Sequence, residues 1–339
     1  MTSETTRSVK LSSVGAPAVS VIVVSYNTRE MTLDCLRSVH AETRRHRFEL
    51  IVIDNASTDG SAEAIAAEFP HLHLTASGEN HGFAVANNLA AARARGEWLL
   101  LLNPDTVVRD GAIDTLLEFA TQHAEAAIFG GRTLFADGSL NPTSCWARPT
   151  LWSSLACAVG LTSLFRGSRL FDPEAMGDWR RDSVRKVDIV TGCFFLLRKR
   201  VWDRLGGFDP QFFMYGEEAD LCLRAAREGL VCLVCPQAEI IHYGGASETV
   251  RAGKMIRLFR ARSQLYARHW NPVAAWLGTR MLDLWALVRL LAFTVGRIFR
   301  LTGSENLEIW REIWKNRQAW RIKPGEKTTV ATGHVHPES

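Results

Sequence analysis

The sequence predicts an α/β fold in which a mostly parallel central sheet is flanked by helices on both faces. Two short apolar runs, residues 19–25 and 49–53, enclose a helical pattern with apolar residues at 31, 33, 36 and 39. Strand, helix and strand within this short stretch are typical of a βαβ unit. Polar residues follow each run, at the edge where such sheets bind ligands.

Apolar periodicity and turn residues indicate the elements that follow. In chain order they are a helix at 61–69, a helix rich in small residues that ends at 95, a strand at 98–102, a helix at 111–123, a strand at 127–130, a strand with a small-residue break at 187–197, a helix that begins near 217, and strands at 231–235 and 240–242. Between 133 and 187 the pattern loosens, with three prolines and four glycines. A long irregular segment of this kind is typical of a substrate loop or lid.

An acid begins the loop after the second strand. Asp54 is a candidate for hydrogen bonding to a nucleobase or ribose, because it stands at the carboxyl end of a parallel strand. The alternative is that Asp54 and Asn55 cap a turn or the helix at 61–69. The sequence has no Gly-x-Gly-x-x-Gly after the first strand and no Gly-Lys-Ser/Thr, so other groups must bind phosphate.

A loop rich in glycine and amide side chains, residues 78–83, comes next. Gly82 allows the backbone to approach a ligand closely, and Asn80 and Asn87 can bond to ribose or phosphate oxygens. These amides and Asp54 are thus candidate groups for binding a nucleotide.

The strand at 98–102 ends in Asn103, Pro104 and Asp105. A divalent cation on Asp105 could bridge the two phosphates of a nucleotide sugar, because hard cations prefer carboxylate and phosphate oxygens. His242 ends the last strand beside glycines and is a candidate for a further metal ligand. The alternatives are an acid in a proline turn and a structural histidine.

Three carboxylates, Glu217, Glu218 and Asp220, open an apolar helix pattern directly after the apolar residues 212–215. Acids at a helix start are stabilised by the exposed N–H groups and the positive end of the dipole, which is one interpretation. The other is a general base, because an apolar wall raises the pKa of a carboxyl group towards that of a base.

The formal charge of +4 conceals a basic C-terminal part. Residues 251–323 carry 15 Lys and Arg against 4 Asp and Glu, a balance of +11, whereas the rest of the chain carries 25 against 32. This part also holds six of the eleven tryptophans, at 270, 276, 285, 310, 314 and 320. Such a combination suits an anionic, amphipathic surface, and no nucleic-acid-binding motif accompanies it, so we expect no nucleic acid partner.

One helix of this basic part is expected to be amphipathic. Its apolar residues recur at spacings of three and four and are Met281, Leu284, Trp285, Val288, Leu291, Ala292, Val295 and Phe299. No uncharged run approaches the ~20 residues of a spanning helix, so we expect a helix that lies in an anionic membrane surface. The alternative is a helix packed on the catalytic domain or on a second subunit of a homo-oligomer.

The domain organisation expected is a disordered polar tail at 1–17, an α/β domain at 18–250 with the loose segment 133–187 as its substrate loop or lid, the helical membrane-associating region at 251–323 and a second disordered tail at 324–339. The seven cysteines form no disulfide framework and no apolar N-terminal segment precedes Pro17, which favours a reducing cytoplasm. Cys232 and Cys235 lie in an apolar run and are interpreted as strand packing.

Eight short motifs in order resemble the inverting glycosyltransferases of family 2 with the GT-A fold, particularly their bacterial rhamnosyltransferase-like branch. The resemblance covers residues 19–247. Its motifs are Val-Val-Ser-Tyr-Asn at 23–27, Val-Ile-Asp-Asn-Ala-Ser-Thr-Asp-Gly at 52–60, Asn-His-Gly-Phe at 80–83 with Asn87, Leu-Leu-Asn-Pro-Asp at 101–105, Thr-Gly at 191–192, Gly-Gly-Phe-Asp at 206–209, the acidic motif at 213–224 and His-Tyr-Gly-Gly-Ala-Ser at 242–247.

The resemblance implies a role for each matching residue. Asp54 would recognise the base, Asp105 and His242 would hold Mg²⁺ or Mn²⁺, and Glu218 would be the general base. Glu217 and Asp220 would orient that base or bind acceptor hydroxyls. Asn103 stands where the family has the first Asp of Asp-x-Asp, and Glu218 is one methylene longer than the family's Asp. The donor-binding set would be Ser25, Tyr26, Asn27, Asp54, Asn80, Asn87, Asn103 and Asp105, and the acceptor set Thr191, Gly192 and Tyr215.

The implied activity is metal-dependent transfer of a sugar to a lipid-linked saccharide at the cytoplasmic face of the inner or plasma membrane, in the synthesis of a cell-surface polysaccharide. The rhamnosyltransferase-like branch implies dTDP-rhamnose as donor. The alternatives are another donor such as a UDP-sugar, and a catalytically degenerate scaffold that binds a sugar nucleotide, which Asn103 and Glu218 would permit.

Overall fold

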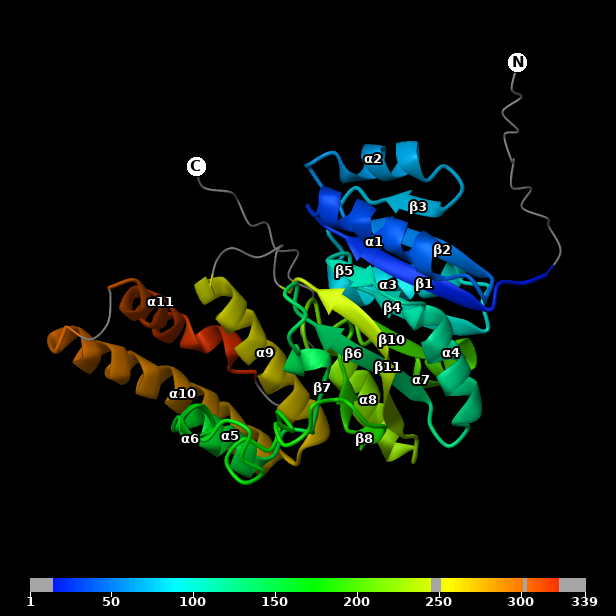
Figure 1. Cartoon of the computed structure of the whole chain (residues 1–339). Coiled ribbons are helices and arrows are strands. Elements are labelled where there is room, and N and C mark those ends of the chain that lie inside the picture. Colours follow the sequence, from blue (N-terminus) through cyan, green and yellow to red (C-terminus); the bar gives the residue numbers. More distant parts are fainter. Residues whose placement is uncertain (1–14, 245–250, 301–303, 323–339) are drawn as a thin grey trace, which may run out of the picture.

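The computed structural model describes residues 15–244, 251–300 and 304–322 (Figure 1). The tails expected at 1–17 and 324–339 lie outside these ranges, except for residues 15–17, and so do residues 245–247 of the last family-like motif.

Within the described residues a nine-stranded sheet has the order β3-β2-β1-β4-β10-β6-β11-β5, and β8 pairs with β11. The strands are β1 (Val19–Ser25), β2 (Phe48–Asp54), β3 (His73–Ala76), β4 (Trp98–Leu102), β5 (Thr106–Val108), β6 (Ile128–Leu134), β8 (Arg185–Val187), β10 (Phe194–Arg198) and β11 (Cys232–His242). A second small sheet pairs β7 (Cys145–Trp146) with β9 (Ile189–Val190).

Strand direction decides which loops meet. β1 runs parallel to β2 and β4, and β6 runs parallel to β11, while β10 lies antiparallel between β4 and β6. The carboxyl ends of β1, β2, β4, β6 and β11 therefore share one edge of the sheet with the amino end of β10. Ligands of open α/β sheets bind at this edge.

Helices cover both faces of the sheet, as the apolar runs predict. One face is covered by α1 (Arg29–Glu42), α2 (Ser61–Glu68) and α4 (Ala112–Gln122), and the other by α3 (Gly82–Arg93), α7 (Lys199–Leu205) and α8 (Glu217–Arg227). Val21 and Val23 of β1 face α1, whereas Ile22 belongs to the core under α3 and α8. Each such buried side chain stabilises the fold by roughly 1.5–3 kcal/mol, and burial on both faces explains why the strands show no polar alternation.

Neither β3 nor β5 was predicted from the sequence pattern. The pattern also predicted two strands where the structure has the single strand β11. β3 is an edge strand with no fully buried residue, so no apolar alternation marks it. The strands expected at 231–235 and 240–242 are one strand, which is irregular between Cys235 and Glu239. Pro236 lies in this irregularity, where its missing N–H is tolerated.

The loose segment 133–187 contains more structure than its composition indicates. Besides β7 and β8 it holds α5 (Leu151–Ala158), which Thr150 and Ser153 open with a capping box, and α6 (Leu161–Leu164). The buried guanidinium of Arg181 donates hydrogen bonds to five backbone carbonyls of this segment. These bonds fix the segment where short apolar patches alone would not.

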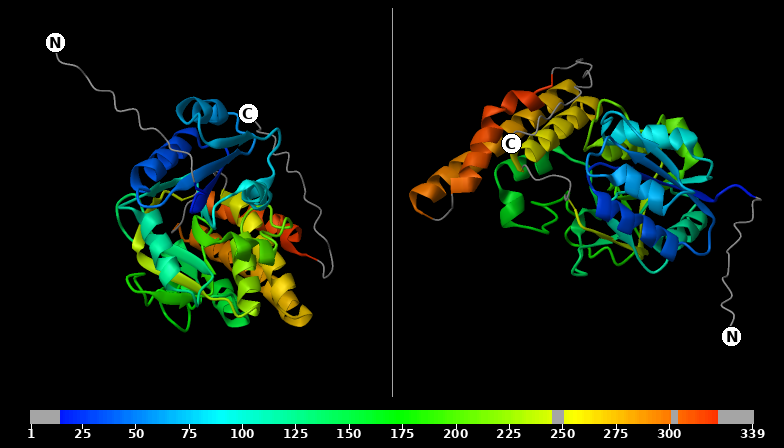
Figure 2. Two further views of the ribbon diagram at one scale, coloured as in Figure 1. Left: turned by 90° about the vertical axis from the view of Figure 1, so that its right-hand side faces the viewer. Right: turned by 90° about the horizontal axis from the view of Figure 1, so that it is seen from above.

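Three C-terminal helices form a layer beside the sheet domain (Figure 2). They are α9 (Arg251–His269), α10 (Pro272–Ile298) and α11 (Ser304–Lys315), followed by the 3-10 turn η2 (Arg317–Trp320). The ring of Phe259 in α9 packs against Trp285 at a tilt and meets Trp320 edge to face, with ring centroids 5.2 and 5.1 Å away. Trp320 is fully buried, and Trp285 and Trp270 are partly buried against the same core, where Trp270 stacks on Tyr266 with centroids 4.1 Å apart.

The apolar face predicted for the helix at 281–299 is divided in the structure. Trp285 packs inward on α9, whereas Leu291, Val295 and Phe299 are exposed. Among the described residues no helix is long and apolar enough to cross a membrane.

Candidate functional site

The predicted cation ligands meet at the carboxyl ends of β4 and β11. Nε2 of His242 lies 3.2 Å from Oδ1 of Asp105, and the N–H of Tyr243 donates to the carbonyl of Asp105 at 3.0 Å. Both ligand side chains are mostly buried, at 14% and 12% exposure. Burial by itself lowers the pKa of His242, but the adjacent Cys193 and the carboxylate of Asp105 raise it to about 10.

Asn103 supports this pair from the same turn. Its Nδ2 lies 3.3 Å from Nε2 of His242, and its backbone N–H donates to the carbonyl of Cys193 at 3.1 Å. The amide that replaces an acid of the family pattern is thus directed at the imidazole.

The carboxylate of Asp105 and the imidazole of His242 are ligands that suit a divalent cation, although they are only two. Mg²⁺ and its ligands are about 2.0–2.1 Å apart, so two neighbouring ligands lie about 3 Å from each other, close to the distance between Asp105 and His242. Within the described part of the chain, no group of three or more His, Cys, Asp and Glu could hold a metal. Asp105 and His242 could therefore supply only part of a coordination sphere, leaving positions for ligand oxygens.

The acid pair Glu217 and Glu218 begins α8 after two residues with positive φ, Tyr215 at 71° and Gly216 at 89°. Left-handed backbone at a non-glycine residue is uncommon and recurs at functional sites. One carboxylate oxygen of each glutamate is buried without a hydrogen-bond partner in the structure. Orphaned buried oxygens are expected where a ligand proton will be received.

Burial raises the pKa of both glutamates. The charge of Glu218 raises that of Glu217 further, while backbone N–H groups at the helix start partly offset the rise at Glu218. Burial also raises the pKa of Tyr215, and the charges of Glu217, Glu218 and Asp105 add to the effect. Tyr215 thus lies within electrostatic reach of both the acid pair and Asp105.

The residues expected to contact the acceptor lie beside the acid pair. A Cβ built on Gly192 would meet the Cβ of Glu218 at 3.8 Å and the ring of Phe83 at 3.5 Å. Thr191 is held by its N–H, which donates to the carbonyl of Ser144 in the loose segment at 3.0 Å. The break between β9 and β10 therefore borders Glu218, and the sequence gave no signal for Phe83 as its neighbour.

Asp54 ends β2, and only one of its two carboxylate oxygens accepts a hydrogen bond in the structure. Oδ2 accepts from the N–H of Ser57 at 3.0 Å, whereas Oδ1 is buried without a partner. The turn cap considered from the sequence is thus present, and it leaves a carboxylate oxygen for a ligand. Tyr26, after β1, is 41% exposed at the same edge.

The other predicted donor-binding residues hold loops in place. Oδ1 of Asn27 accepts from the N–H of Thr58 at 2.7 Å, and the buried hydroxyl of Ser25 lies 3.0 Å from that of Thr32. Oδ1 of Asn80 accepts from the N–H of Gly82 at 2.9 Å and from Nδ2 of Asn55. Nδ2 of Asn87 donates within its own helix, to the carbonyl of Phe83 at 2.8 Å.

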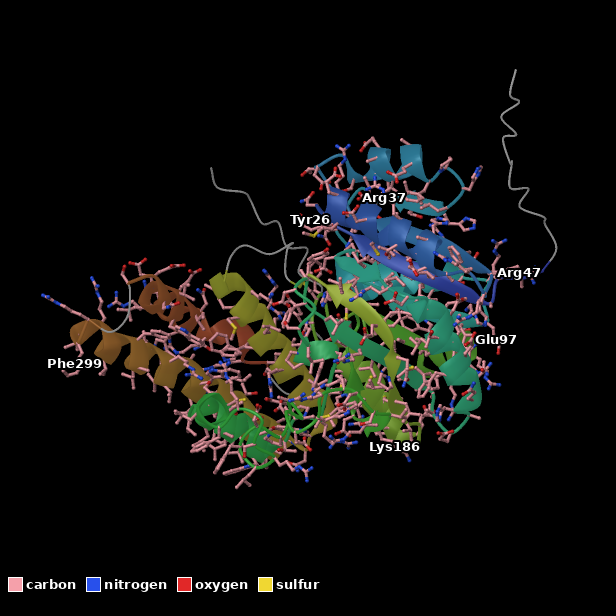
Figure 3. The ribbon with its side chains drawn as sticks, viewed as in Figure 1. Tyr26, Arg37, Arg47, Glu97, Lys186 and Phe299 are labelled. Carbon is pink, nitrogen blue, oxygen red and sulfur yellow. The ribbon has the colours of Figure 1, made fainter. Side chains whose placement is uncertain are left out.

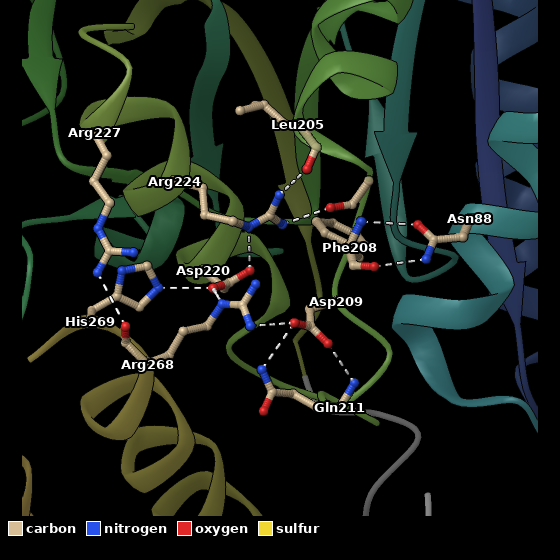
Figure 4. A network of polar contacts seen from close by, with 11 residues as sticks. Asn88, Leu205, Phe208, Asp209, Gln211, Asp220, Arg224, Arg227, Arg268 and His269 are labelled. Atoms are coloured by element: carbon tan, nitrogen blue, oxygen red, sulfur yellow. Dashed lines mark hydrogen bonds and ion pairs between the residues drawn. The ribbon is translucent and has the colours of Figure 1, made fainter. Parts of the chain in front are cut away.

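Asp220, the third acid of the cluster, is fully buried in a network of cations (Figure 4). Its Oδ1 accepts from Nε2 of His269 at 2.8 Å and forms an ion pair with Nε of Arg268 at 2.6 Å, and its Oδ2 accepts from Nε of Arg224 at 2.7 Å. Burial opposes ionisation, but His269, Arg224 and Arg268 together lower the pKa of Asp220. The carboxylate is therefore turned towards the C-terminal helices.

The network continues to a loop and to α7. Arg268 pairs with Asp209, whose Oδ1 accepts from the N–H of Gln211 at 3.0 Å, and Nη2 of Arg224 donates to the carbonyl of Gly207 at 2.6 Å. Sequence reasoning missed His269 and Arg268, because they lie in a basic helix outside every motif. Only folding brings them to α8.

Comparisons with known proteins show which family the chain matches. The model of glycosyl transferase family 2 matches residues 20–206, more than half of the chain. An N-acetylglucosaminyl-diphospho-decaprenol L-rhamnosyltransferase of Mycobacterium tuberculosis is 28% identical over 241 residues, which are 66% of this chain and 75% of the relative. Rhamnosyltransferase WbbL of Escherichia coli K12 is 27% identical over 237 residues, 66% of this chain and 83% of the relative.

Among solved structures, the mannosyltransferase PcManGT of Pyrobaculum calidifontis, in complex with GDP-Man and Mn²⁺, aligns with a TM-score of 0.54. Sequence identity is 20%, over 90% of this chain and 86% of that chain. This likeness shows the fold, and the α/β architecture expected from the sequence is confirmed.

Proposed function

The chain belongs to glycosyltransferase family 2, and from its strand-edge residues we propose that it transfers rhamnose from dTDP-rhamnose to a lipid-linked saccharide. The observation that carries the proposal is the meeting of two polar pairs at one edge of the sheet, Asp105 with His242 and Glu217 with Glu218. Similarity to the two rhamnosyltransferases supports the sugar, and the diphospho-decaprenol acceptor of the mycobacterial relative supports the acceptor class.

Donor binding is assigned to the ends of β1, β2 and β4. The buried Oδ1 of Asp54, which has no partner in the structure, would accept from a ring N–H of the base or from the ribose, and Tyr26 offers a partly exposed ring for stacking. Ser25, Asn27 and Asn80 act indirectly in this proposal, since they hold the segments that follow these strands, and Asn87 stabilises the first turn of α3.

Asp105 and His242 would hold a divalent cation, with donor phosphate oxygens completing its coordination. The bound Mg²⁺ or Mn²⁺ would supply positive charge against the negative charge that develops on the leaving nucleoside diphosphate. Asn103 would orient the imidazole of His242 for this task, a role in which an amide serves where the family pattern has an acid.

Glu218 is proposed as the general base. It takes the proton of the acceptor hydroxyl as that oxygen bonds to the anomeric carbon, while the bond from that carbon to the donor phosphate breaks with its electron pair. A single displacement from the opposite face inverts the anomeric centre. Glu217 would orient Glu218 or bind acceptor hydroxyls, and Thr191, Gly192 and Tyr215 would border the acceptor hydroxyl.

We also propose that the protein works at the cytoplasmic face of the membrane as a peripheral enzyme. The +11 balance of residues 251–323 supports attraction to anionic lipid. A lipid-linked acceptor would be presented at that surface.

The test is a transfer assay with the full chain, Mg²⁺ or Mn²⁺, and an N-acetylglucosaminyl-diphospho-lipid. With dTDP-rhamnose, mass spectrometry should find the acceptor heavier by one deoxyhexosyl group, and UDP-sugars should give no product. Product from a UDP-sugar alone would overturn the donor assignment. Nucleotide binding with no transfer from any donor would indicate the degenerate scaffold instead.

A further inference from the structure

Exposed apolar side chains of this protein are concentrated on two elements outside the active site. Twelve of the seventeen large apolar side chains that are exposed in the described residues come from α10 with its cap and from residues 152–170. They are Val273, Trp276, Leu277, Leu291, Val295, Ile298 and Phe299 on the first, and Trp152, Val159, Leu164, Phe165 and Leu170 on the second. Apolar side chains gathered in this way on a soluble surface usually mark an interaction site.

The exposed residues of α10 lie on the side turned away from its neighbours. Gly278, Leu282 and Ala286 are buried against the other C-terminal helices, and the spacing of the exposed residues places most of them on the opposite side of the helix. Val273 is 69% and Ile298 is 70% exposed, so the exposed residues form one group near each end of the helix, at 273–277 and 291–299. Phe299 stands at the tip of α10, far from the sheet (Figure 3).

The second segment lies against α10 (Figure 1). Nη2 of Arg289 donates to Oγ of Ser163 in α6 at 2.7 Å, and the hydroxyl of Ser154 in α5 lies 2.9 Å from that of Tyr266. Arg262 of α9 adds a bidentate pair with Glu174 at 2.7 and 2.9 Å. The α5–α6 segment and α10 are thus fixed side by side.

The charges on these two segments have one sign. Residues 151–170 and 272–300 contain six arginines and one acid, Asp283. Asp283 is buried and pairs with Arg280 and Arg321 at 2.8 and 3.0 Å. Arg169 pairs with Asp178 at 2.8 Å, and the exposed arginines Arg166, Arg297 and Arg300 leave a positive charge on these two segments.

We infer that α10 and the α5–α6 segment together form the face that docks on an anionic lipid surface. Apolar side chains bordered by arginines match the acyl and headgroup layers of such a surface, whereas a second copy of the chain would bring arginines against arginines. The inference deepens the proposed function and rests on it, because a lipid-linked acceptor would then reach the segment 133–187 from the docked face.

The test is flotation of the full chain with phosphatidylcholine vesicles that contain or lack phosphatidylglycerol. Wild type should float only with the anionic vesicles, and salt should release it incompletely, because salt does not screen apolar burial. Ile298→Asp and Leu164→Asp, one on each element, should each weaken vesicle partition by at least about tenfold. Leu89→Asp is the matched control, since Leu89 is 43% exposed on α3, and it should float like wild type.

Several results would overturn the inference. Wild type that stays at the bottom with anionic vesicles would do so, and so would Ile298→Asp and Leu164→Asp variants that float normally. A wild-type dimer that these variants convert to monomer would show that a second copy covers the face. Donor turnover with a water-soluble acceptor, measured in parallel, separates the two ideas: transfer without flotation overturns only the docking face, and flotation without transfer overturns only the proposed function.

Discussion

Nε2 of His269, the last residue of α9, donates to Oδ1 of Asp220 in the first turn of α8 at 2.8 Å. This bond joins the C-terminal helices to the helix that begins with Glu217 and Glu218. Asp220 also pairs with Arg224 and Arg268, and we propose that it positions the acid pair.

Asp220→Asn should destabilise the protein by about 3 kcal/mol, because removing one partner leaves buried cations uncompensated. Turnover should fall as α8 loses its anchor, while affinity for nucleoside diphosphate should change little. Chemical denaturation and a kcat against KM comparison measure these effects. Asp203→Asn is the control, since Asp203 pairs with Lys199 at an exposed position and should cost almost nothing.

The same carboxylate predicts how stability depends on pH. The folded pKa of Asp220 lies below its ordinary value of 3.8, so its contribution is complete above that value and is lost as the pH falls through the folded pKa. The difference in unfolding free energy between wild type and Asp220→Asn should therefore be constant near neutral pH and should narrow below about pH 4. A difference that grows on acidification would contradict this sign.

Glu218→Gln keeps the size of the side chain but cannot take a proton. Turnover should fall at least ~10²-fold, as is typical when a general base is lost, with donor affinity nearly unchanged. Single-turnover transfer and nucleotide titration measure the two quantities. Glu217→Gln is the comparison, and near-normal turnover in Glu218→Gln with loss in Glu217→Gln would move the role of base to Glu217.

Asp105→Ala should abolish metal-dependent nucleotide binding, and His242→Ala should weaken it and slow transfer. Calorimetry with nucleoside diphosphate, with and without Mn²⁺, is the measurement. Binding to the wild type that is indifferent to a chelator would show that these residues do not act through a cation.

Arg181→Met should loosen the segment 133–187, because five backbone carbonyls lose their donor while the rest of the fold keeps its contacts. Limited proteolysis should cut this segment first in the variant and not in the wild type. Arg166→Met, at an exposed position of the same segment, should leave the cleavage pattern unchanged. Equal protection of Arg181→Met and wild type would mean that other contacts fix the segment.

The sequence by itself determined the α/β fold and the edge where the site lies. Apolar runs such as 19–25 are buried on both faces, and only a sheet covered by helices on both sides satisfies that requirement. Asp54 and His242 follow such runs directly and Asp105 follows one after two residues, so their shared edge could be predicted from strand order. Edge strand β3 could not be predicted, because none of its residues is fully buried and its sequence therefore shows no apolar pattern.

Only the tertiary structure shows which residues contact the third acid and which side chains of the basic region are covered. In the sequence, nothing distinguishes the surroundings of Asp220 from those of Glu218. Its partners Arg268 and His269 are almost fifty residues away, and no local pattern predicts contacts over that separation. Likewise, periodicity placed Trp285 and Val295 on one face of a helix, and only packing showed that the first is covered by α9 while the second is exposed. Local periodicity fixes which side chains share a face, whereas contacts distant in the chain determine what covers that face.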